Sequence, residues 1–389
     1  MREIVIVGAG QGGLQAAMCL RQDGFAGRIT LIGAEAGLPY QRPPLSKAYL
    51  KSGDAGALQL RPASFFEKKD ITLITGTRVD SIDRAARSLR AGGRDLRYDH
   101  LILATGTRNL RPPIPGADLA LDLRTLEDAA RLRAALDRPR RCAVIGGGFI
   151  GLEFAAVARA LGHEVTLAEA APRLMARAVS AETSARFLGL HEGMGTRVHL
   201  GDPVREVFPG GIRLASGTRI EAEVVLMAAG VTPNTELAAA AGLAVDNGVV
   251  VDGRLLTADP AISALGDCAV FPDPVSGRPV RLESVQAATD HARLISRRLL
   301  GMADDRYDAV PWFWSDQADS KLQIAGLATA GDETVTRGDG AIFRFNAGRL
   351  SAVETVNDAR THMQSRKRLA GAPVLRRHLE AAGFDLAAV

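Results

Sequence analysis

Short apolar runs alternate along this chain with segments whose apolar residues recur at helical spacing. The first such unit has the run EIVIV at 3–7, helical spacing over Leu14 to Leu20, and a second apolar run over Ile29 to Ile32. A short run without polar residues is typical of a parallel strand that is buried on both faces. The pattern therefore predicts a strand–helix–strand unit with parallel strands.

The same unit occurs a second time, displaced by 138 residues (from Gly8 to Gly146). It has the apolar run CAVI at 142–145, an expected helix over 152–161 and a further strand over 164–168. A repeat of this length indicates an internal duplication rather than an array of short repeats.

A glycine-rich turn of the form G-x-G-x-x-G joins the strand to the helix in both units. The first glycine permits a sharp exit from the strand, the second lets a pyrophosphate approach the backbone, and the third lets the helix pack closely. Phosphate is favoured at such a helix N-terminus by the free N–H groups and the helix dipole. One such turn can be merely structural, whereas two in the same context predict two dinucleotide sites. The glycines are Gly8, Gly10 and Gly13 in the first turn and Gly146, Gly148 and Gly151 in the second.

An acidic residue follows the second strand of each unit. Glu35 lies 22 residues after Gly13, and Glu169 lies 18 residues after Gly151. At this spacing a carboxylate accepts hydrogen bonds from the ribose of an adenine dinucleotide. The charge of Glu169 would repel a 2′-phosphate, which favours NAD over NADP, although the nearby Arg173 leaves NADP open.

The composition excludes several other classes of protein. The 389 residues are 47% hydrophobic and 24% charged, which is typical of a globular protein of two or three domains. We expect neither a membrane nor a nucleic-acid partner, because the longest apolar runs are short and the net charge is only +4. Since residues 1–3 lead directly into an apolar strand, we expect no targeting segment and a cytoplasmic location.

Cysteine and histidine give no sign of a metal or a redox disulfide. Cys19, Cys142 and Cys268 are far apart and form no C-x-x-C motif. The seven histidines lack the spacing of metal ligands, so no metal is expected. A G-x-S-x-G motif is absent from the sequence, and hydrolase chemistry therefore has no support.

Further motifs carry a family resemblance. The first three, LILATG at 101–106, VVLMAAG at 224–230 and ALGD at 264–267, are expected strands, and the others are PYQRPPLSK at 39–47, LESVQAA at 282–288 and PWFWSDQ at 311–317. With the paired glycine turns, the first three resemble the flavoprotein reductases that bind two dinucleotides. The last three resemble the FAD-dependent NADH:ferredoxin reductases of Rieske dioxygenase and bacterial cytochrome P450 systems, the group that is similar to putidaredoxin reductase.

The resemblance implies an α/β fold with two Rossmann-like dinucleotide-binding domains, as in glutathione-reductase-like flavoproteins, and a C-terminal α+β interface domain. The FAD-binding domain would comprise 1–108 and 235–309, the NAD-binding domain 109–234, and the C-terminal domain 310–389. Alternating apolar residues on both sides of Asn346-Ala347-Gly348 independently predict a hairpin in the last domain.

The resemblance also implies roles for individual residues. Lys47 would lie beside the flavin and pair with Glu153, and Trp314 would lie against the flavin ring. The residues assigned to FAD are Gly8, Gly10, Gly13, Glu35, Arg42, Lys47, Ala104, Thr105, Gly106, Asp267, Val285 (at the start of a helix) and Trp314. Those assigned to NAD are Gly146, Gly148, Phe149, Ile150, Gly151, Glu169 and Gly230. The chain departs from the family at Ala34, often an acid, and at Ala287, usually asparagine.

Simpler interpretations stay open for several of these residues. Lys47 could be a solvated loop lysine, and Glu153 a carboxylate on a helix surface. Trp312 and Trp314 could pack in the core, which we favour for Trp312. The basic run 366–368 is more typical of a solvated helix face than of a docking site.

The function implied by the resemblance is electron transfer from NADH through FAD to a small acidic [2Fe–2S] ferredoxin, by a monomer or weak dimer. Without a cysteine pair, electrons would leave directly from the flavin. The alternatives are an NADH reductase acting on rubredoxin, a quinone or oxygen, and a redox-regulated binding protein similar to apoptosis-inducing factor.

Overall fold

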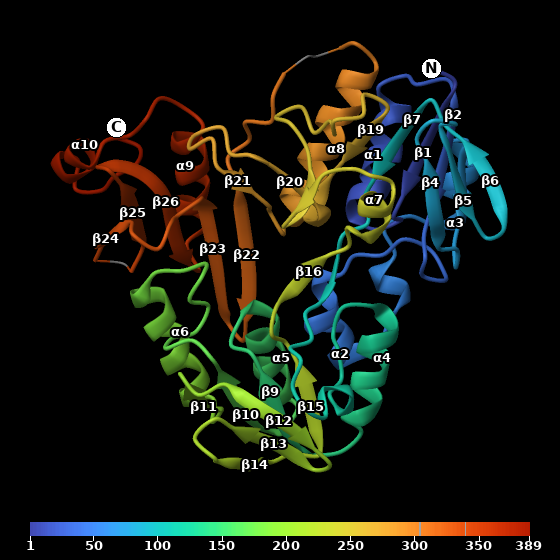
Figure 1. Cartoon of the computed structure of the whole chain (residues 1–389). Coiled ribbons are helices and arrows are strands. Elements are labelled where there is room, and N and C mark those ends of the chain that lie inside the picture. The colour runs from blue at the N-terminus through green and yellow to red at the C-terminus, as the bar shows by residue number, and fades with distance from the viewer. Residues whose placement is uncertain (303–304, 339) are drawn as a thin grey trace. The chain divides into compact units, whose positions relative to one another are not determined.

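The computed structural model describes residues 1–302, 305–338 and 340–389 (Figure 1). These residues form two compact units, each assembled from separate stretches of the chain. Unit 1 comprises Met1–Gln41, Gly56–Arg108 and Thr232–Ala309, and unit 2 comprises Arg42–Ala55, Asn109–Val231 and Val310–Val389. In the described part of the chain, no helix combines the length and apolar character that crossing a bilayer requires.

A five-stranded parallel sheet forms the centre of unit 1. Its strands, in spatial order, are β19 (Ile262–Ala264), β7 (His100–Leu103), β1 (Glu3–Val7), β2 (Arg28–Ile32) and β3 (Ile71–Ile74). Ile4, Ile6 and Leu31 are fully buried in this sheet, as the continuous apolar runs predict. The predicted strands at 3–7 and 29–32 are therefore confirmed.

Helix α1 (Gln11–Gln22) packs against α8 (Val285–Leu299) in unit 1. The predicted helix is confirmed, but it begins at Gln11 rather than at Leu14. The apolar pattern misses the first turn because its residues are not apolar, although their backbone is already helical. A Cβ on Gly12 would lie 2.4 Å from Cδ1 of Leu265, so a larger residue here would displace that side chain.

Smaller elements complete unit 1. They are β4 (Val79–Asp83), β5 (Ser88–Ala91), β6 (Arg94–Arg97), β17 (Val245–Asp246), β18 (Gly248–Val250), β20 (Ala269–Pro272), β21 (Pro279–Val280), α3 (Ala63–Lys68), α7 (Glu236–Ala240), η2 (Gly56–Leu58) and η4 (Gly266–Cys268). Strands β4 to β6 form an antiparallel sheet, and β17, β18, β20 and β21 form another sheet. The connecting strands β8 (Thr107–Asn109) and β16 (Val231–Pro233) pair with each other.

Unit 2 contains the second copy of the duplicated fold. Its parallel sheet has the order β11 (Arg197–Leu200), β10 (Glu164–Glu169), β9 (Arg141–Ile145) and β15 (Val224–Met227). The antiparallel strands β12 (Val204–Phe208), β13 (Gly211–Leu214) and β14 (Arg219–Glu221) form a separate sheet. The helical elements are η1 (Pro43–Ser46), α2 (Ala48–Ser52), η3 (Ala117–Leu119), α4 (Leu126–Ala135), α5 (Phe149–Ala160) and α6 (Ala181–Gly193).

Three predicted strands end earlier than the sequence motifs suggest. Strand β7 ends at Leu103, β15 at Met227 and β19 at Ala264, so the expected strand at 264–267 is wrong in its bounds. A glycine two or three residues after each strand has a positive φ: 63° at Gly106, 113° at Gly230 and 67° at Gly266. This backbone conformation cannot continue a strand.

The C-terminal part of unit 2 is a five-stranded antiparallel sheet with two helices, drawn in orange to red in Figure 1. The strand order is β22 (Trp312–Gln317), β23 (Ser320–Gly326), β26 (Arg349–Val356), β25 (Ile342–Asn346) and β24 (Glu333–Thr336). The helices are α9 (Ala359–Leu369) and α10 (Arg376–Ala381).

The hairpin predicted in this region is confirmed. Asn346 pairs with Arg349, which leaves a two-residue loop. Ala347 and Gly348 in this loop have φ values of 47° and 73°, as a tight hairpin turn that matches the strand twist requires. The α/β fold class is confirmed as well, whereas the division into three domains stays a prediction.

A buried ion pair joins the antiparallel sheet to the start of α6. Glu354 accepts a hydrogen bond from Arg344 at 2.8 Å, and it also accepts the backbone N–H and the hydroxyl of Ser180, each at 2.8 Å. The Arg344 and Glu354 side chains are only 6% and 1% exposed. Because Ser180 also caps α6, this cluster fixes the helix to the sheet.

We expect Arg344→Leu to destabilise the C-terminal sheet by about 3–5 kcal/mol, because it leaves the Glu354 charge buried without its partner. Urea denaturation followed by the fluorescence of the two tryptophans, both in β22, measures this change. Glu127→Gln, which breaks the exposed pair with Arg131, is the matched control and leaves the midpoint unchanged. An equal, small effect of both substitutions would contradict the prediction.

Candidate functional site

The two glycine turns have the same backbone geometry. The first glycine has a φ of 112° at Gly8 and 110° at Gly146. A Cβ on Gly8 would lie 2.1 Å from the carbonyl oxygen of Ala104, and one on Gly146 would lie 2.3 Å from that of Ala228. Only glycine can occupy either position, so the sharp exit from the strand is built into both copies.

The third glycine of each turn brings the helix against the turn itself. A Cβ on Gly13 would lie 1.8 Å from the oxygen of Gly8, and one on Gly151 would lie 2.3 Å from the oxygen of Gly146. No side chain larger than hydrogen fits at either position.

The second glycine of each turn faces open space. No described heavy atom lies within 4 Å of a Cβ built on Gly10 or Gly148. Both residues are helix N-caps, and no side chain within the described residues caps α1 or α5. Each turn therefore offers room and uncapped N–H donors, which fits the diphosphate of FAD or NAD.

Each predicted acid is held by neighbours in its own unit. The two oxygens of Glu169 accept the backbone N–H groups of Gly147 (2.5 Å) and Ala171 (2.7 Å), which fixes the carboxylate beside the second turn. Glu35 follows β2 and accepts a hydrogen bond from the hydroxyl of Tyr40. Tyr40 is a residue whose contact we did not anticipate, although it lies in the motif at 39–47.

The arginine that left NADP open is engaged elsewhere. Arg173 donates to the carbonyl oxygens of Ala176, Val179 and Ser180, which order its own loop. Arg177 in the same loop is exposed, and its guanidinium lies 3.5 Å from a Cβ built on Gly230. Sequence reasoning did not single out Arg177, because it belongs to none of the motifs and its only sequence signal is that it lies close to Arg173.

Lys47 and Glu153 form an ion pair of 2.7 Å in unit 2. The Glu153 side chain is 3% exposed and that of Lys47 is 20% exposed. Neither residue is the solvated surface group of the simpler interpretation. The pair expected from the resemblance is thus present, while its place beside a flavin stays a prediction.

Glu153 accepts hydrogen bonds from three side chains. Its Oε2 atom accepts the hydroxyl of Ser46 at 2.6 Å as well as the Lys47 ammonium, and its Oε1 atom accepts the hydroxyl of Ser315 at 2.8 Å. Lys47 also donates to the carbonyl of Pro43 at 3.2 Å. These contacts compensate the cost of burying the two charges and fix the carboxylate in one orientation.

A chain of hydrogen bonds continues from Glu153 into the interior of unit 2. The Gln317 amide donates to the Ser315 hydroxyl at 3.2 Å, and its oxygen lies 2.9 Å from Nε2 of His191. Burial lowers the pKa of His191. The neutral ring therefore donates from Nε2 to Gln317, and its Nδ1 atom has no partner among the described atoms. Sequence reasoning did not identify Ser315, Gln317 or His191 as site residues.

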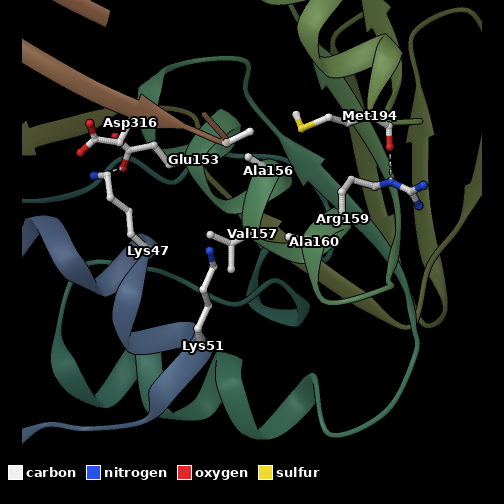
Figure 2. Close-up of a pocket in the computed structure, with 10 residues that line it drawn as sticks. Lys47, Lys51, Glu153, Ala156, Val157, Arg159, Ala160, Met194 and Asp316 are labelled. Carbon is white, nitrogen blue, oxygen red and sulfur yellow. Dashed lines mark hydrogen bonds and ion pairs between the residues drawn. The ribbon is translucent and has the colours of Figure 1, made fainter. Parts of the chain in front are cut away.

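A pocket of about 390 Å³ opens next to the Lys47–Glu153 pair (Figure 2). One wall is a face of α5, and Figure 2 shows Lys47 and Lys51 projecting towards this helix from the segment that contains α2. The lining residues are Lys47, Lys51, Glu153, Ala156, Val157, Arg159, Ala160, Met194, Asp316 and Ala318. The spacing of Glu153, Ala156, Val157 and Ala160 is that of one helix face.

The aromatic residues of β22 point alternately to its two faces. The Trp312 and Trp314 rings lie 5.7 Å apart and both are partly buried, so Trp312 is not the simple core residue that we favoured. Arg366 lies over the Trp312 ring at 4.4 Å and is therefore not only a solvated residue. The ring centroids of Phe313 and Phe149 lie 4.5 Å apart.

The remaining residues assigned to NAD lie around the second turn. Phe149 and Ile150 are the first two residues of α5, and Ile150 is 43% exposed. Gly230 follows β15, and its carbonyl oxygen accepts the N–H of Leu110 at 2.9 Å.

The residues assigned to FAD in unit 1 follow β7 and β19. Ala104, Thr105 and Gly106 come directly after β7, and the Thr105 hydroxyl donates to the carbonyl of Asn234 at 2.7 Å. Asp267 lies in η4 and accepts the hydroxyl of Thr107 at 3.3 Å.

Helix α8 begins at Val285, as predicted, because Ser284 caps it by accepting the N–H of Ala287 at 3.0 Å. In unit 2, Arg42 donates to the carbonyl of Arg124 at 2.7 Å. These contacts hold the predicted residues in place within their own units.

Comparison with known proteins agrees with this geometry. Residues 2–292 match the family model described as pyridine nucleotide-disulphide oxidoreductase, and residues 312–389 match the model described as reductase C-terminal. The rhodocoxin reductase of Rhodococcus erythropolis is 48% identical over 381 residues, which cover 94% of this chain and 89% of that protein.

Two further relatives have similar coverage. The ferredoxin–NAD(+) reductase component of the anthranilate 1,2-dioxygenase system of Burkholderia cepacia is 42% identical over 94% of this chain and 93% of its own. The crystal structure of the ferredoxin reductase for the CYP199A2 system from Rhodopseudomonas palustris superposes with a TM-score of 0.96, at 46% identity and with 100% of both chains covered. The chain thus belongs to the pyridine nucleotide-disulphide oxidoreductase family and, within it, to the ferredoxin reductases that the sequence motifs predicted.

Proposed function

We propose that this protein is an NADH:ferredoxin reductase that supplies an oxygenase with electrons. Two observations together carry the proposal. One is the pair of glycine turns, which we call the first cradle (Gly8 to Gly13) and the second cradle (Gly146 to Gly151). The other is the buried Lys47–Glu153 pair. FAD and NADH are the cofactor and cosubstrate, as predicted and as the family membership supports. When bound, FAD accepts a hydride from NADH and releases the two electrons one at a time.

The protein's own residues bind and orient the two dinucleotides. In this proposal the first cradle binds FAD, with Gly8, Gly10, Gly13, Glu35, Arg42, Lys47, Ala104, Thr105, Gly106, Asp267, Val285 and Trp314 as its contacts. The second cradle binds NADH through Gly146, Gly148, Phe149, Ile150, Gly151, Glu169 and Gly230. The N-termini of α1 and α5 donate N–H groups to the diphosphates.

Lys47 and Glu153 act on the charge of the reacting centre. Beside the reduced ring, the Lys47 ammonium would favour the extra electron density there, and Glu153 holds that ammonium in one position. Trp314 would cover the ring and restrict the access of water. The donors around Glu153 keep this arrangement rigid before any ligand binds.

The cysteines offer no route for the electrons. All three are free and buried, and burial raises the pKa of the Cys142 thiol to about 12. Burial also raises the pKa of Cys19 and Cys268. Because a thiolate is the reactive form, electrons leave directly to the acceptor without a dithiol step.

The partner that we propose is a small acidic [2Fe–2S] ferredoxin, and the reductase is a monomer or weak dimer in the cytoplasm. The net charge of +4 supports attraction to an acidic partner, which acts mainly on the association rate. Ferredoxin reductases of dioxygenase and cytochrome P450 systems among the relatives also support this partner.

Stopped-flow reoxidation of the NADH-reduced protein by alternative acceptors tests the proposed function. We expect a [2Fe–2S] ferredoxin to reoxidise the protein faster than rubredoxin, a quinone or oxygen, and the rate to fall with added salt because the attraction is screened. Ferredoxin as the slowest acceptor would contradict the proposal. Slow turnover with every acceptor, with dimer formation on adding NADH, would favour a redox-regulated binding protein.

The same substitution in the two cradles tests which dinucleotide each one binds. Gly10→Ala and Gly148→Ala are both compatible with the extended backbone and the open space at these positions. We expect Gly10→Ala to lower the bound FAD per chain, and Gly148→Ala to retain FAD but raise the KM for NADH by about tenfold, or about 1.4 kcal/mol. Absorbance at 450 nm and steady-state kinetics measure these effects, and the reverse result would exchange the assignments.

Glu169→Ala tests the ribose contact. We expect the KM for NADH to rise by about tenfold while that for NADPH does not rise, because the carboxylate no longer binds the 2′-hydroxyl or repels a 2′-phosphate. Glu164→Ala, which removes an exposed carboxylate at the other end of β10, is the control and leaves both values unchanged. Unaltered use of NADH by Glu169→Ala would show that the ribose role is wrong.

A further inference from the structure

The proposed reaction leaves a proton that must reach solvent. NADH delivers a hydride, which is two electrons and one proton, whereas an iron–sulfur acceptor takes one electron and no proton. The balance is NADH + 2 oxidised acceptors → NAD⁺ + 2 reduced acceptors + H⁺. This inference rests on the proposed function, in which Lys47 Nζ would lie beside the flavin ring that accepts the hydride.

Among the described residues of unit 2, the hydrogen bonds that lead from Glu153 into the interior offer this proton no exit. From Glu153 the hydrogen bonds lead to Ser315, then to the Gln317 amide, and end at buried His191. A carboxamide is a poor proton relay, because it has no readily exchanged acidic or basic site at neutral pH. His191 is fully buried, and that burial, which also lowers its pKa, opposes its taking up the charge.

The pocket on the other side of the ion pair is open to solvent. Its volume of about 390 Å³ is room for about a dozen waters at their share of liquid volume. Lys47 and Glu153 line one end, and Asp316 is the other carboxylate among the lining residues (Figure 2). Lys51 and Arg159 also line it, and Arg159 is anchored to the carbonyl of Met194 at 2.8 Å. Small side chains on the α5 wall, Ala156 and Ala160, leave the space unfilled.

We propose that this pocket is the route by which the proton leaves the active site. Lys47 Nζ passes a proton to a pocket water, either directly or through Glu153 Oε2, 2.7 Å away, which releases it to the water. Lys47 Nζ then takes up the proton that the reduced flavin ring would release. Pocket water carries the proton outward, and the Asp316 carboxylate accepts it on the way to bulk solvent. The Lys47–Glu153 pair regains its original charges after each turnover, so atoms and charge balance.

Two variants separate this route from a structural role. Asp316→Asn removes the acceptor on the pocket wall without changing its size, and Ala156→Leu fills the pocket one helical turn from Glu153. Asp319→Asn is the matched control, because Asp319 is an exposed acid after the same strand that does not line the pocket. The holoenzyme is reduced with NADH and mixed with ferricyanide, a one-electron acceptor that needs no protein docking.

The experiment follows two signals in the same stopped-flow reaction. The absorbance of the flavin reports its reoxidation, and a pH indicator in weakly buffered solution reports proton release. In the unaltered protein and in Asp319→Asn, we expect one proton per NADH to appear together with the yellow colour. In Asp316→Asn and Ala156→Leu, proton release lags by at least about tenfold, as loss of a proton-transfer group predicts. Added imidazole, a small proton carrier, restores the rate in Asp316→Asn, which a merely structural role would not produce.

The possible outcomes distinguish this inference from the proposed function. A holoprotein that NADH does not bleach would overturn the proposed function and the inference with it. Normal bleaching with proton release that keeps pace in both variants would overturn the inference alone. Should Ala156→Leu fail to fold, Asp316→Asn and its response to imidazole still decide the matter.

Discussion

The burial of one carboxylate, Glu153, is the constraint on which the rest of the site depends. A buried charge is tolerated only with a partner of opposite sign and with donors for its remaining lone pairs. Three residues meet this requirement: Ser46 at the end of η1, Lys47 at the start of α2, and Ser315 in β22. The short stretch Arg42–Ala55 therefore belongs to unit 2, although the chain on both sides of it belongs to unit 1. The cost of an unpaired charge thus links three remote segments of the sequence.

The duplicated cradle shows how strongly backbone sterics restrict a sequence. Gly8 and Gly146 have almost the same φ, and each would place a Cβ against a carbonyl oxygen of the neighbouring strand's end. The two copies differ where the constraint is weaker. Gly147 of the second turn donates its N–H to Glu169, whereas Ala9 stands at the equivalent position of the first. Shared geometry and divergent side chains fit two cradles of one origin.

Elements with a strong local signal were predictable, and their bounds were less so. The strands at 3–7 and 142–145 and the hairpin at Asn346-Ala347-Gly348 follow from apolar runs and turn residues. Helices α1 and α5 begin earlier than predicted, because their first residues belong to the glycine motifs that we assigned to the turns. Several strands end earlier than predicted, since a positive φ at the following glycine is a property of the folded backbone.

The sequence by itself determined the two parallel-sheet units, the glycines that shape their turns and the acid that follows each one, because short-range sterics and apolar periodicity act within a few tens of residues. It indicated the family through motifs of the same short range. Only the tertiary structure decided that Ser46 and Ser315 would both bind Glu153, across separations of 107 and 162 residues. The buried His191 and the pocket beside Lys47 were likewise invisible in the sequence. A hydrogen-bond partner at such distance is selected by packing, and packing leaves no periodic trace along the chain.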